Sequence, residues 1–209
     1  MPALRFIHSS DLHLGRRFLN IPEPPDGNLR GRLMEARFDQ IGRLAEAARQ
    51  NGAEHVLLAG DTFDSATPSP QVLRQAMAAM RDETDVTWWL LPGNHDNMRN
   101  AEPVWEAILK DAPENIRALL LSEPVELKAG AMLLPCPVPV RSSGRDLTET
   151  LPTTETPEGA LRIGLAHGGV VDFSESGEQI PPGRDRTAAL DYLALGDWHG
   201  RLEVSSRTH

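Results

Sequence analysis

Five short polar clusters hold the side chains of this sequence that could do chemistry. In chain order they read HSSDLHLG, GDTFD, PGNHD, HGG and GDWHG. Each alone has an ordinary explanation, since an aspartate after a strand often caps a helix and asparagine often lies in turns. Together they are more specific, because the same residue types recur at five separate points of the chain. The candidate ligands of a metal are Asp11, His13, Asp61, Asn94, His167, Asp197 and His199.

These residue types favour divalent cations. Carboxylates crowded in one pocket repel and raise one another's pKa unless a cation lies between them. A mixture of aspartate, histidine and asparagine suits manganese, iron or zinc better than magnesium or calcium alone. Seven candidates exceed what one ion takes from a protein, so two ions that share a carboxylate fit better, with Asp61 as the bridge. We predict two divalent ions, with manganese, iron and zinc as the candidates.

An apolar run of strand length stands directly before each cluster. Ligands of open α/β sheets bind beyond the carboxyl ends of the strands, so we expect the five clusters to converge on one site. The predicted strands are Leu4–Ile7, Val56–Ala59, Val86–Leu91, Leu161–Ala166 and Tyr192–Leu195.

The segments between the strands predict a layered α/β fold. Helical spacing of apolar residues marks Leu29–Gln50, Pro70–Arg81 and Val104–Lys110, which gives a β-α-β-α-β alternation. Short runs between Ile116 and Val140, among them Ala131–Leu134, favour strands and turns of a second sheet, broken by Pro124, Pro135, Pro137 and Pro139. The polar segments 141–160 and 172–186 are expected to be surface loops, the first with one helical turn.

Composition limits the class of protein. The 209 residues suit one globular domain, and 40% hydrophobic with 24% charged residues exclude wholesale disorder. Cys136 is the single cysteine, so no internal disulfide can form. We find neither a membrane span nor a signal peptide, and we expect a cytoplasmic protein.

The net charge of −9 argues against a polyanionic partner held by overall electrostatic attraction alone. The charge is unevenly distributed along the chain. Residues 1–50 hold eight arginines against six acidic residues, whereas residues 51–209 hold 13 basic against 24 acidic residues. A polyanion would therefore favour the N-terminal part, where Arg16 and Arg17 could meet backbone phosphates.

The five clusters resemble the blocks of the calcineurin-like metallophosphoesterase superfamily: D-x-H, G-D-x-x-D, G-N-H-D/E, a histidine after a strand, and G-x-H. The resemblance covers nearly the whole chain. Within the superfamily, HSSDLHLG, GDTFD, PGNHD, LAHGG and YLALG are similar to the SbcD-type nuclease subunit of the double-strand-break repair complex. The resemblance implies a four-layer α/β/β/α sandwich, lacking its last strands in this chain, and hydrolysis of phosphoesters.

The resemblance also implies ligand sets. One ion would be held by Asp11, His13, Asp61 and His199, and the other by Asp61, Asn94, His167 and residue 197. The nuclease pattern G-H-x-H has histidine at this last position, whereas this chain has Asp197. An aspartate there predicts a changed metal preference, a less acidic bound water, or a weaker second site.

Three further residues receive roles by the same resemblance. His95 would contact the phosphate or protonate the leaving group, and the alternative is a histidine that only supports the ligands. Asp96 would fix the orientation of His95, and Asp64 would support the site from near its edge.

The family normally continues beyond the point where this sequence ends, ten residues after His199. We therefore expect residues 1–209 to form one catalytic domain, C-terminally short, without capping or ATPase-binding segments. A second copy of the chain could cover the open sheet edge.

Three functions remain open from the sequence. The first is a manganese-dependent DNA exonuclease or endonuclease, with DNA and an ATPase subunit as partners. The second is a small-molecule phosphodiesterase or phosphatase, which the acidic balance favours. The third is a catalytically impaired module that binds metal or nucleic acid.

Overall fold

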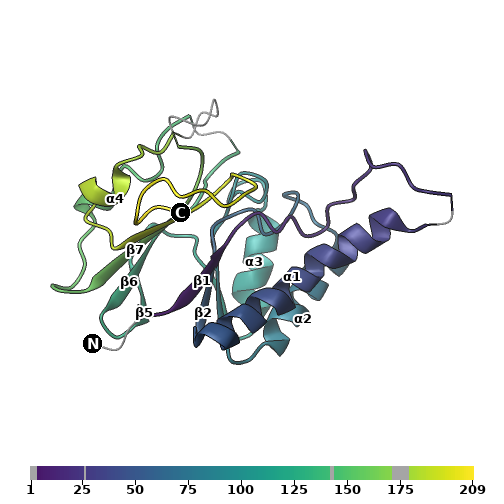
Figure 1. Cartoon of the computed structure of the whole chain (residues 1–209), viewed down its shortest axis with the longest axis horizontal. Helices are drawn as coiled ribbons and strands as arrows, with labels where there is room; N and C mark the ends of the chain where they lie inside the picture. Colours follow the sequence, from purple (N-terminus) through teal and green to yellow (C-terminus); the bar gives the residue numbers. More distant parts are fainter. Residues whose placement is uncertain (1–3, 26, 142–143, 171–178) are drawn as a thin grey trace.

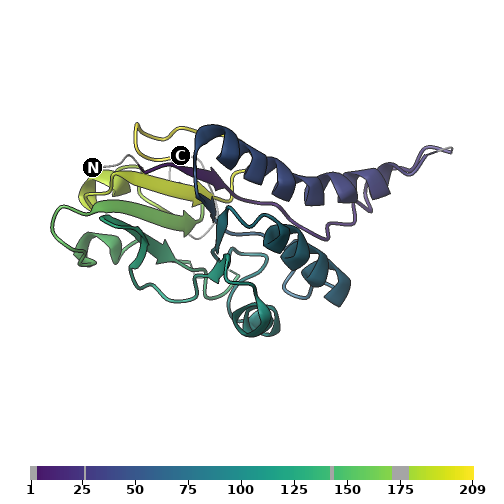
Figure 2. The same cartoon turned by 90° about the horizontal axis from the view of Figure 1, so that it is seen from below.

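The computed structural model describes residues 4–25, 27–141, 144–170 and 179–209. They form two four-stranded sheets that pack against each other, with helices on the outer face of the first (Figures 1 and 2). Residues 172–178 of the predicted loop 172–186 lie outside the described residues.

The first sheet has its four strands side by side in chain order and all parallel. Because each crossover joins neighbouring strands with the same hand, all three connecting helices cover one face of the sheet. The strands are β1 (Phe6–Ser9), β2 (His55–Leu58), β3 (Thr87–Leu90) and β4 (Ile116–Ala118), and the helices are α1 (Leu29–Asn51), α2 (Pro70–Asp82) and α3 (Glu102–Asp111).

Local signals explain where the first two helices begin and end. The side chain of Asn28 accepts a hydrogen bond from the backbone N–H of Gly31, and that of Ser69 accepts one from Val72. Gly52 ends α1 in the left-handed conformation that glycine adopts without steric cost. The predicted helices agree with the structure to within two residues at each end.

The second sheet has the order β5-β6-β7-β8, with β5 antiparallel to β6 and the other pairs parallel. Pro135 was expected to interrupt the strands, and this was wrong because it lies within β6. The pairing with β5 ends at Leu133, so Pro135 has a strand on one side only, where its missing N–H is tolerated. The strands are β5 (Val125–Lys128), β6 (Ala131–Cys136), β7 (Leu161–His167) and β8 (Tyr192–Gly196).

Three apolar clusters separate four layers and confirm the predicted α/β/β/α arrangement. Trp88 packs between the first sheet and its helices, whereas its neighbour Trp89 packs between the two sheets. The third cluster lies on the outer face of the second sheet, under a thin layer that includes the 3₁₀ turn Leu151–Thr153 and α4 (Arg184–Thr187). The turn matches the helical turn predicted within 141–160, and α4 was not predicted.

In the part of the chain that the structure describes, no helix combines the length and apolar character needed to cross a bilayer.

Candidate metal centre

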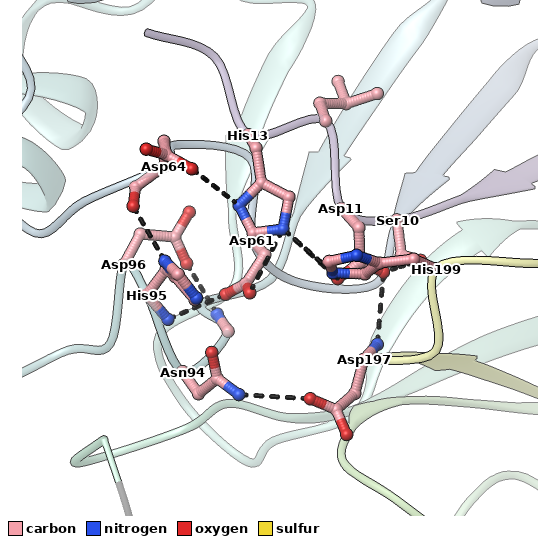
Figure 3. A network of polar contacts seen from close by, with 12 residues as sticks. Ser10, Asp11, His13, Asp61, Asp64, Asn94, His95, Asp96, Asp197 and His199 are labelled. Carbon is pink, nitrogen blue, oxygen red and sulfur yellow. Dashed lines mark hydrogen bonds and ion pairs between the residues drawn. The ribbon is translucent and has the colours of Figure 1, made fainter. Parts of the chain in front are cut away.

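The carboxyl ends of strands from both sheets meet at one edge, where all seven predicted ligands come together. Figure 3 labels these ligands except His167. The loops after β1, β2 and β3 carry the first four ligands in chain order, which are Asp11, His13, Asp61 and Asn94. His167 ends β7, and the loop after β8 brings Asp197 and His199. The convergence follows from parallel strands that end at the same level.

Three ligand atoms form a first group. Nε2 of His13 lies 3.8 Å from Oδ1 of Asp11 and 3.2 Å from Nε2 of His199, which is itself 3.6 Å from the same Asp11 oxygen. Ligand atoms that share one ion through bonds of about 2.1 Å lie roughly 3 to 3.5 Å apart. The group is therefore close to the size that one ion requires.

A second group lies around His167. Its Nε2 is 3.6 Å from Oδ2 of Asp61 and 3.8 Å from Oδ1 of Asp197. The same Asp61 oxygen is 3.9 Å from Nε2 of His13 in the first group. One carboxylate oxygen thus faces both groups, as a bridging ligand would.

Several buried atoms at this centre have no hydrogen-bond partner. They include Oδ1 of Asp11, Oδ1 of Asn94 and Nε2 of His167. An unsatisfied buried polar atom costs about 1 to 3 kcal/mol, so three at one point are unfavourable. All three carry lone pairs that divalent cations would accept, so the residues fit the ions that their types predict.

Neighbouring groups fix which atoms of the ligands face the centre. Nδ1 of His167 donates a hydrogen bond to the carbonyl oxygen of Ala59 at 2.8 Å, which leaves the lone pair on Nε2. The side-chain amide of Asn94 donates to Asp197 at 3.1 Å, which leaves the carbonyl oxygen of Asn94 free. Such partners orient metal ligands and tune their basicity.

The backbone is strained at four of the candidate ligands. Asp11, His13, Asp61 and Asp197 have φ values of 57°, 44°, 54° and 102°. Residues with a Cβ rarely adopt such angles, and they cluster at functional sites where surrounding contacts impose them. Here the N–H of Asp11 donates to Gly60 and that of His13 donates to Asp61, at 3.1 and 3.0 Å, so the loops after β1 and β2 hold each other.

Glycines let the ligand loops approach closely. A Cβ on Gly93 would lie 2.2 Å from Oδ1 of Asp61, and one on Gly60 would lie 2.3 Å from Nδ1 of His167. Neither leaves room for a side chain. The G-D and G-N pairs in the motifs are therefore a packing requirement of the centre.

Burial shifts the pKa values of the charged groups. Burial raises the pKa of Asp61, and burial together with the charge of Asp61 raises the pKa of Asp96 to about 6. Burial, and next the neighbouring His95, lower the pKa of His13 to about 4, so its imidazole is neutral at pH 7. Crowded carboxylates beside a neutral histidine are an environment that a cation stabilises.

The structure gives Asp96 other partners than the expected one. Asp96 was expected to orient His95, and this was wrong: its buried carboxylate accepts the backbone N–H groups of Phe63 and Gly93, at 3.0 and 2.7 Å. Nδ1 of His95 instead donates to the backbone carbonyl of Asp64 at 2.7 Å. The backbone N–H of His95 donates to Oδ1 of Asp61 at 2.8 Å.

Asp64 lies at the rim of the centre, where the sequence placed it. Its Oδ1 is 3.4 Å from Nδ1 of His13, and its side chain is 31% exposed. The D-x-x-D spacing identified this residue, but its contact with His13 joins two loops and has no signal in the sequence.

A groove of about 1240 Å³ opens beside the first ligand group and runs along β1. Asp11, His13 and His199 line one end, with Arg37 and Trp198 near them. Trp198 is 44% exposed, so it belongs to the wall of this groove and not to the core.

The chain belongs to the calcineurin-like phosphoesterase family, whose model matches residues 4–203. This family comprises metal-dependent hydrolases of ester bonds, and it uses a dimetal centre. This confirms the superfamily that the five clusters resemble.

The chain is similar to two curated proteins. The chain is 27% identical over 213 residues to "Uncharacterized metallophosphoesterase YhaO" of Bacillus subtilis (strain 168), covering 97% of this chain and 50% of that protein. It is 30% identical over 95 residues to "DNA double-strand break repair protein Mre11" of Archaeoglobus fulgidus, covering 44% and 19%. The chain thus spans half or less of the length of these relatives.

A solved crystal structure shares the fold at 12% sequence identity, with a TM-score of 0.51 over 82% of this chain and 84% of that one.

Proposed function

We propose that this protein is a two-metal phosphodiesterase that cuts DNA, with manganese as its metal and an SbcD-type nuclease as its nearest functional counterpart. The observation that carries the two-metal part is Oδ2 of Asp61, which faces His13 of one ligand group and His167 of the other. The partial similarity to a DNA double-strand break repair protein supports DNA as the substrate.

The proposed ligand sets follow the two groups of atoms. Asp11, His13, Asp61 and His199 would hold one ion. Asp61, Asn94, His167 and Asp197 would hold the other. When bound, two divalent ions supply a lowered pKa of water and neutralise charge on the phosphoryl group.

His95 is the proposed catalytic residue. Its Nδ1 is committed to the carbonyl of Asp64, so Nε2 is the nitrogen that would contact the phosphate or protonate the departing oxygen. Asp61 holds the backbone of His95 in place, which couples the catalytic side chain to the bridging ligand. Asp64 positions both this histidine and His13.

A small-molecule phosphodiesterase or phosphatase is the second candidate. The charge of the chain supports it, because 13 basic against 24 acidic residues in 51–209 repel a long polyanion from most of the surface. A module that binds metal without turnover is the third candidate, supported by Asp197 at a position where nuclease sequences have histidine.

The test is an assay of the purified chain with manganese on linear duplex DNA, single strands, cyclic nucleotides and bis(p-nitrophenyl) phosphate. We expect manganese-dependent cleavage of DNA and of the diester, and loss of both in Asp61→Asn. If the protein cleaves the small esters but leaves DNA uncut, it is a small-molecule phosphodiesterase or phosphatase and our proposal is wrong. Bound manganese without turnover on any substrate would replace it by the binding module.

The predicted ATPase partner, the homodimer and the cytoplasmic location rest on the sequence alone. Mass measurement in solution tests the dimer directly.

A further inference from the structure

Two guanidinium groups lie against one phenyl ring beside the metal centre. The Cζ atoms of Arg16 and Arg37 are 5.7 and 5.5 Å from the ring centroid of Phe18. Arg16 and Phe18 belong to the loop that follows β1, whereas Arg37 belongs to α1. Distances below about 6 Å allow cation–π attraction, which holds these two like charges near each other.

The local backbone favours a built arrangement over a chance contact of exposed arginines. Phe18 has a φ of 53°, a left-handed conformation that a bulky residue rarely adopts. Arg37 is anchored, since its Nη1 donates to the carbonyl oxygens of Asp11 and Leu12 at 3.2 and 2.8 Å. Burial, and next the charge of Arg16, lower the pKa of Arg37, as expected for two cations held together.

The arginine pair adjoins the residues of the metal centre. Nη1 of Arg16 lies 3.9 Å from Oδ1 of Asp64, which is 3.4 Å from Nδ1 of His13. Arg37 lines the groove together with Asp11 and His13. An anion at the arginines would therefore lie next to, and not within, the metal centre.

We propose that Arg16 and Arg37 form a subsite for a second phosphate group of the substrate, next to the phosphate whose ester bond is cut. The inference rests on the proposed function, because a DNA strand carries a second phosphate next to the one that is cut, whereas an isolated phosphodiester does not. Arginine suits this role through its planar donor fork and its ability to stack on an aromatic ring. In a chain of net charge −9, the pair provides local attraction that most of the surface lacks.

A nucleic-acid strand and a nucleoside diphosphate both offer such a phosphate. The test is therefore to measure the binding of a fluorescent eight-nucleotide oligothymidylate and of ADP, in EDTA and over a range of salt concentrations. The variant is Arg16→Gln, because Arg37 also holds the loop of Asp11. We expect its affinity for the strand to fall about three- to tenfold, and the slope of log affinity against log salt to shrink by about 0.7.

Two further variants isolate the charge from general damage. Arg16→Lys keeps the charge without the fork, so it should restore the salt slope but only part of the affinity. Arg81→Gln is the matched control: Arg81 is exposed and pairs with Asp82 at the end of α2, which leads to the amino end of β3, away from the centre. It should change neither quantity.

Turnover separates this inference from the proposed function. In Arg16→Gln the ratio of kcat/KM for the strand to kcat/KM for bis(p-nitrophenyl) phosphate should fall, because the second substrate has a single phosphate. An equal fall on both substrates, or an unchanged salt slope, would overturn the subsite. Weakened ADP binding with no strand binding by the parent protein would support the subsite and assign it to nucleotides. A reduced salt slope in a protein that cuts neither substrate would support the subsite and defeat the proposed function.

Discussion

Asn94 and Asp197 are 103 positions apart in the chain, yet the side-chain amide of Asn94 donates a hydrogen bond to Oδ1 of Asp197 at 3.1 Å (Figure 3). The contact decides which end of the Asn94 amide faces the centre, because the donor end is used and Oδ1 stays without a partner. Asp197 thus orients one proposed ligand and also lies within 3.8 Å of another, His167.

Asp197→Ala should weaken one of the two metal sites. Removing the carboxylate takes away a proposed ligand and frees the Asn94 amide to rotate, and loss of such an orienting partner costs about 10- to 100-fold in metal affinity. Titration with manganese in a calorimeter should give one site near the parent affinity and one much weaker. Asp111→Ala, at an exposed position ending α3, is the control. If both sites keep the parent affinity for manganese in Asp197→Ala, Asp197 is not a metal ligand.

Two glycine substitutions should change stability in opposite directions. Gly93→Ala places a Cβ 2.2 Å from Oδ1 and 2.3 Å from the backbone nitrogen of Asp61, and overpacking of this kind costs about 1 to 3 kcal/mol. Gly42→Ala adds a Cβ within α1 whose nearest neighbour, Oε1 of Glu83, is 3.8 Å away, so it should stabilise by about 0.5 to 1 kcal/mol. Urea unfolding measures both. A stable Gly93→Ala protein that still binds metal would contradict the packing of this loop.

His95→Asn should stop turnover without removing the metals. Asparagine keeps the backbone N–H that donates to Asp61, but it has no imidazole to act on the phosphate or the leaving oxygen. Loss of a general acid costs about 10²- to 10⁴-fold in rate. Elemental analysis of the same preparation should find the parent metal content. Turnover near the parent value would show that His95 only supports the site.

The convergence of the ligands was predictable because it follows from topology. Apolar runs locate parallel strands, and parallel strands end at one edge, so clusters behind each run must meet there. The boundaries were less predictable. β1 was expected at Leu4–Ile7 but extends from Phe6 to Ser9, because its hydrogen-bond ladder continues through the polar His8 and Ser9 to pair with Leu57 and Leu58.

The contacts around the ligands had no signal in the sequence. The carbonyl of Asp64 holds the ring of His95, and any residue type offers a carbonyl at that point. The family resemblance assigned Asp96 to His95, but its carboxylate instead accepts hydrogen bonds from the backbone N–H groups of Phe63 and Gly93. Likewise, no spacing rule brings Arg37 to Phe18. Such pairs depend on how the loops pack, which periodicity does not report.

Divalent metal should stabilise the fold. The buried atoms of Asp11, Asn94 and His167 that lack hydrogen-bond partners gain them when a cation binds. A ligand at 100 times its Kd stabilises by about 2.7 kcal/mol, which in a chain of this size raises Tm by roughly 5 to 10 °C. Thermal unfolding with manganese and with EDTA measures the difference. His167→Ala should lose most of the shift, and an equal Tm in both buffers would contradict the metal centre.

Cys136 should be inert in the folded protein. Burial, and next the charge of Asp146, raise the pKa of its thiol from 9.0 to about 12, so the reactive thiolate is excluded at neutral pH. A thiol reagent such as dithionitrobenzoate should therefore react only after unfolding. The unfolded chain gives up this proton first, so the contribution of the group to stability is complete below pH 9 and declines as the pH rises toward 12. The difference between the unfolding midpoints at pH 8 and pH 10 should be larger in the parent protein than in Cys136→Ala. Equal differences in the two proteins would show that burial does not shield the thiol.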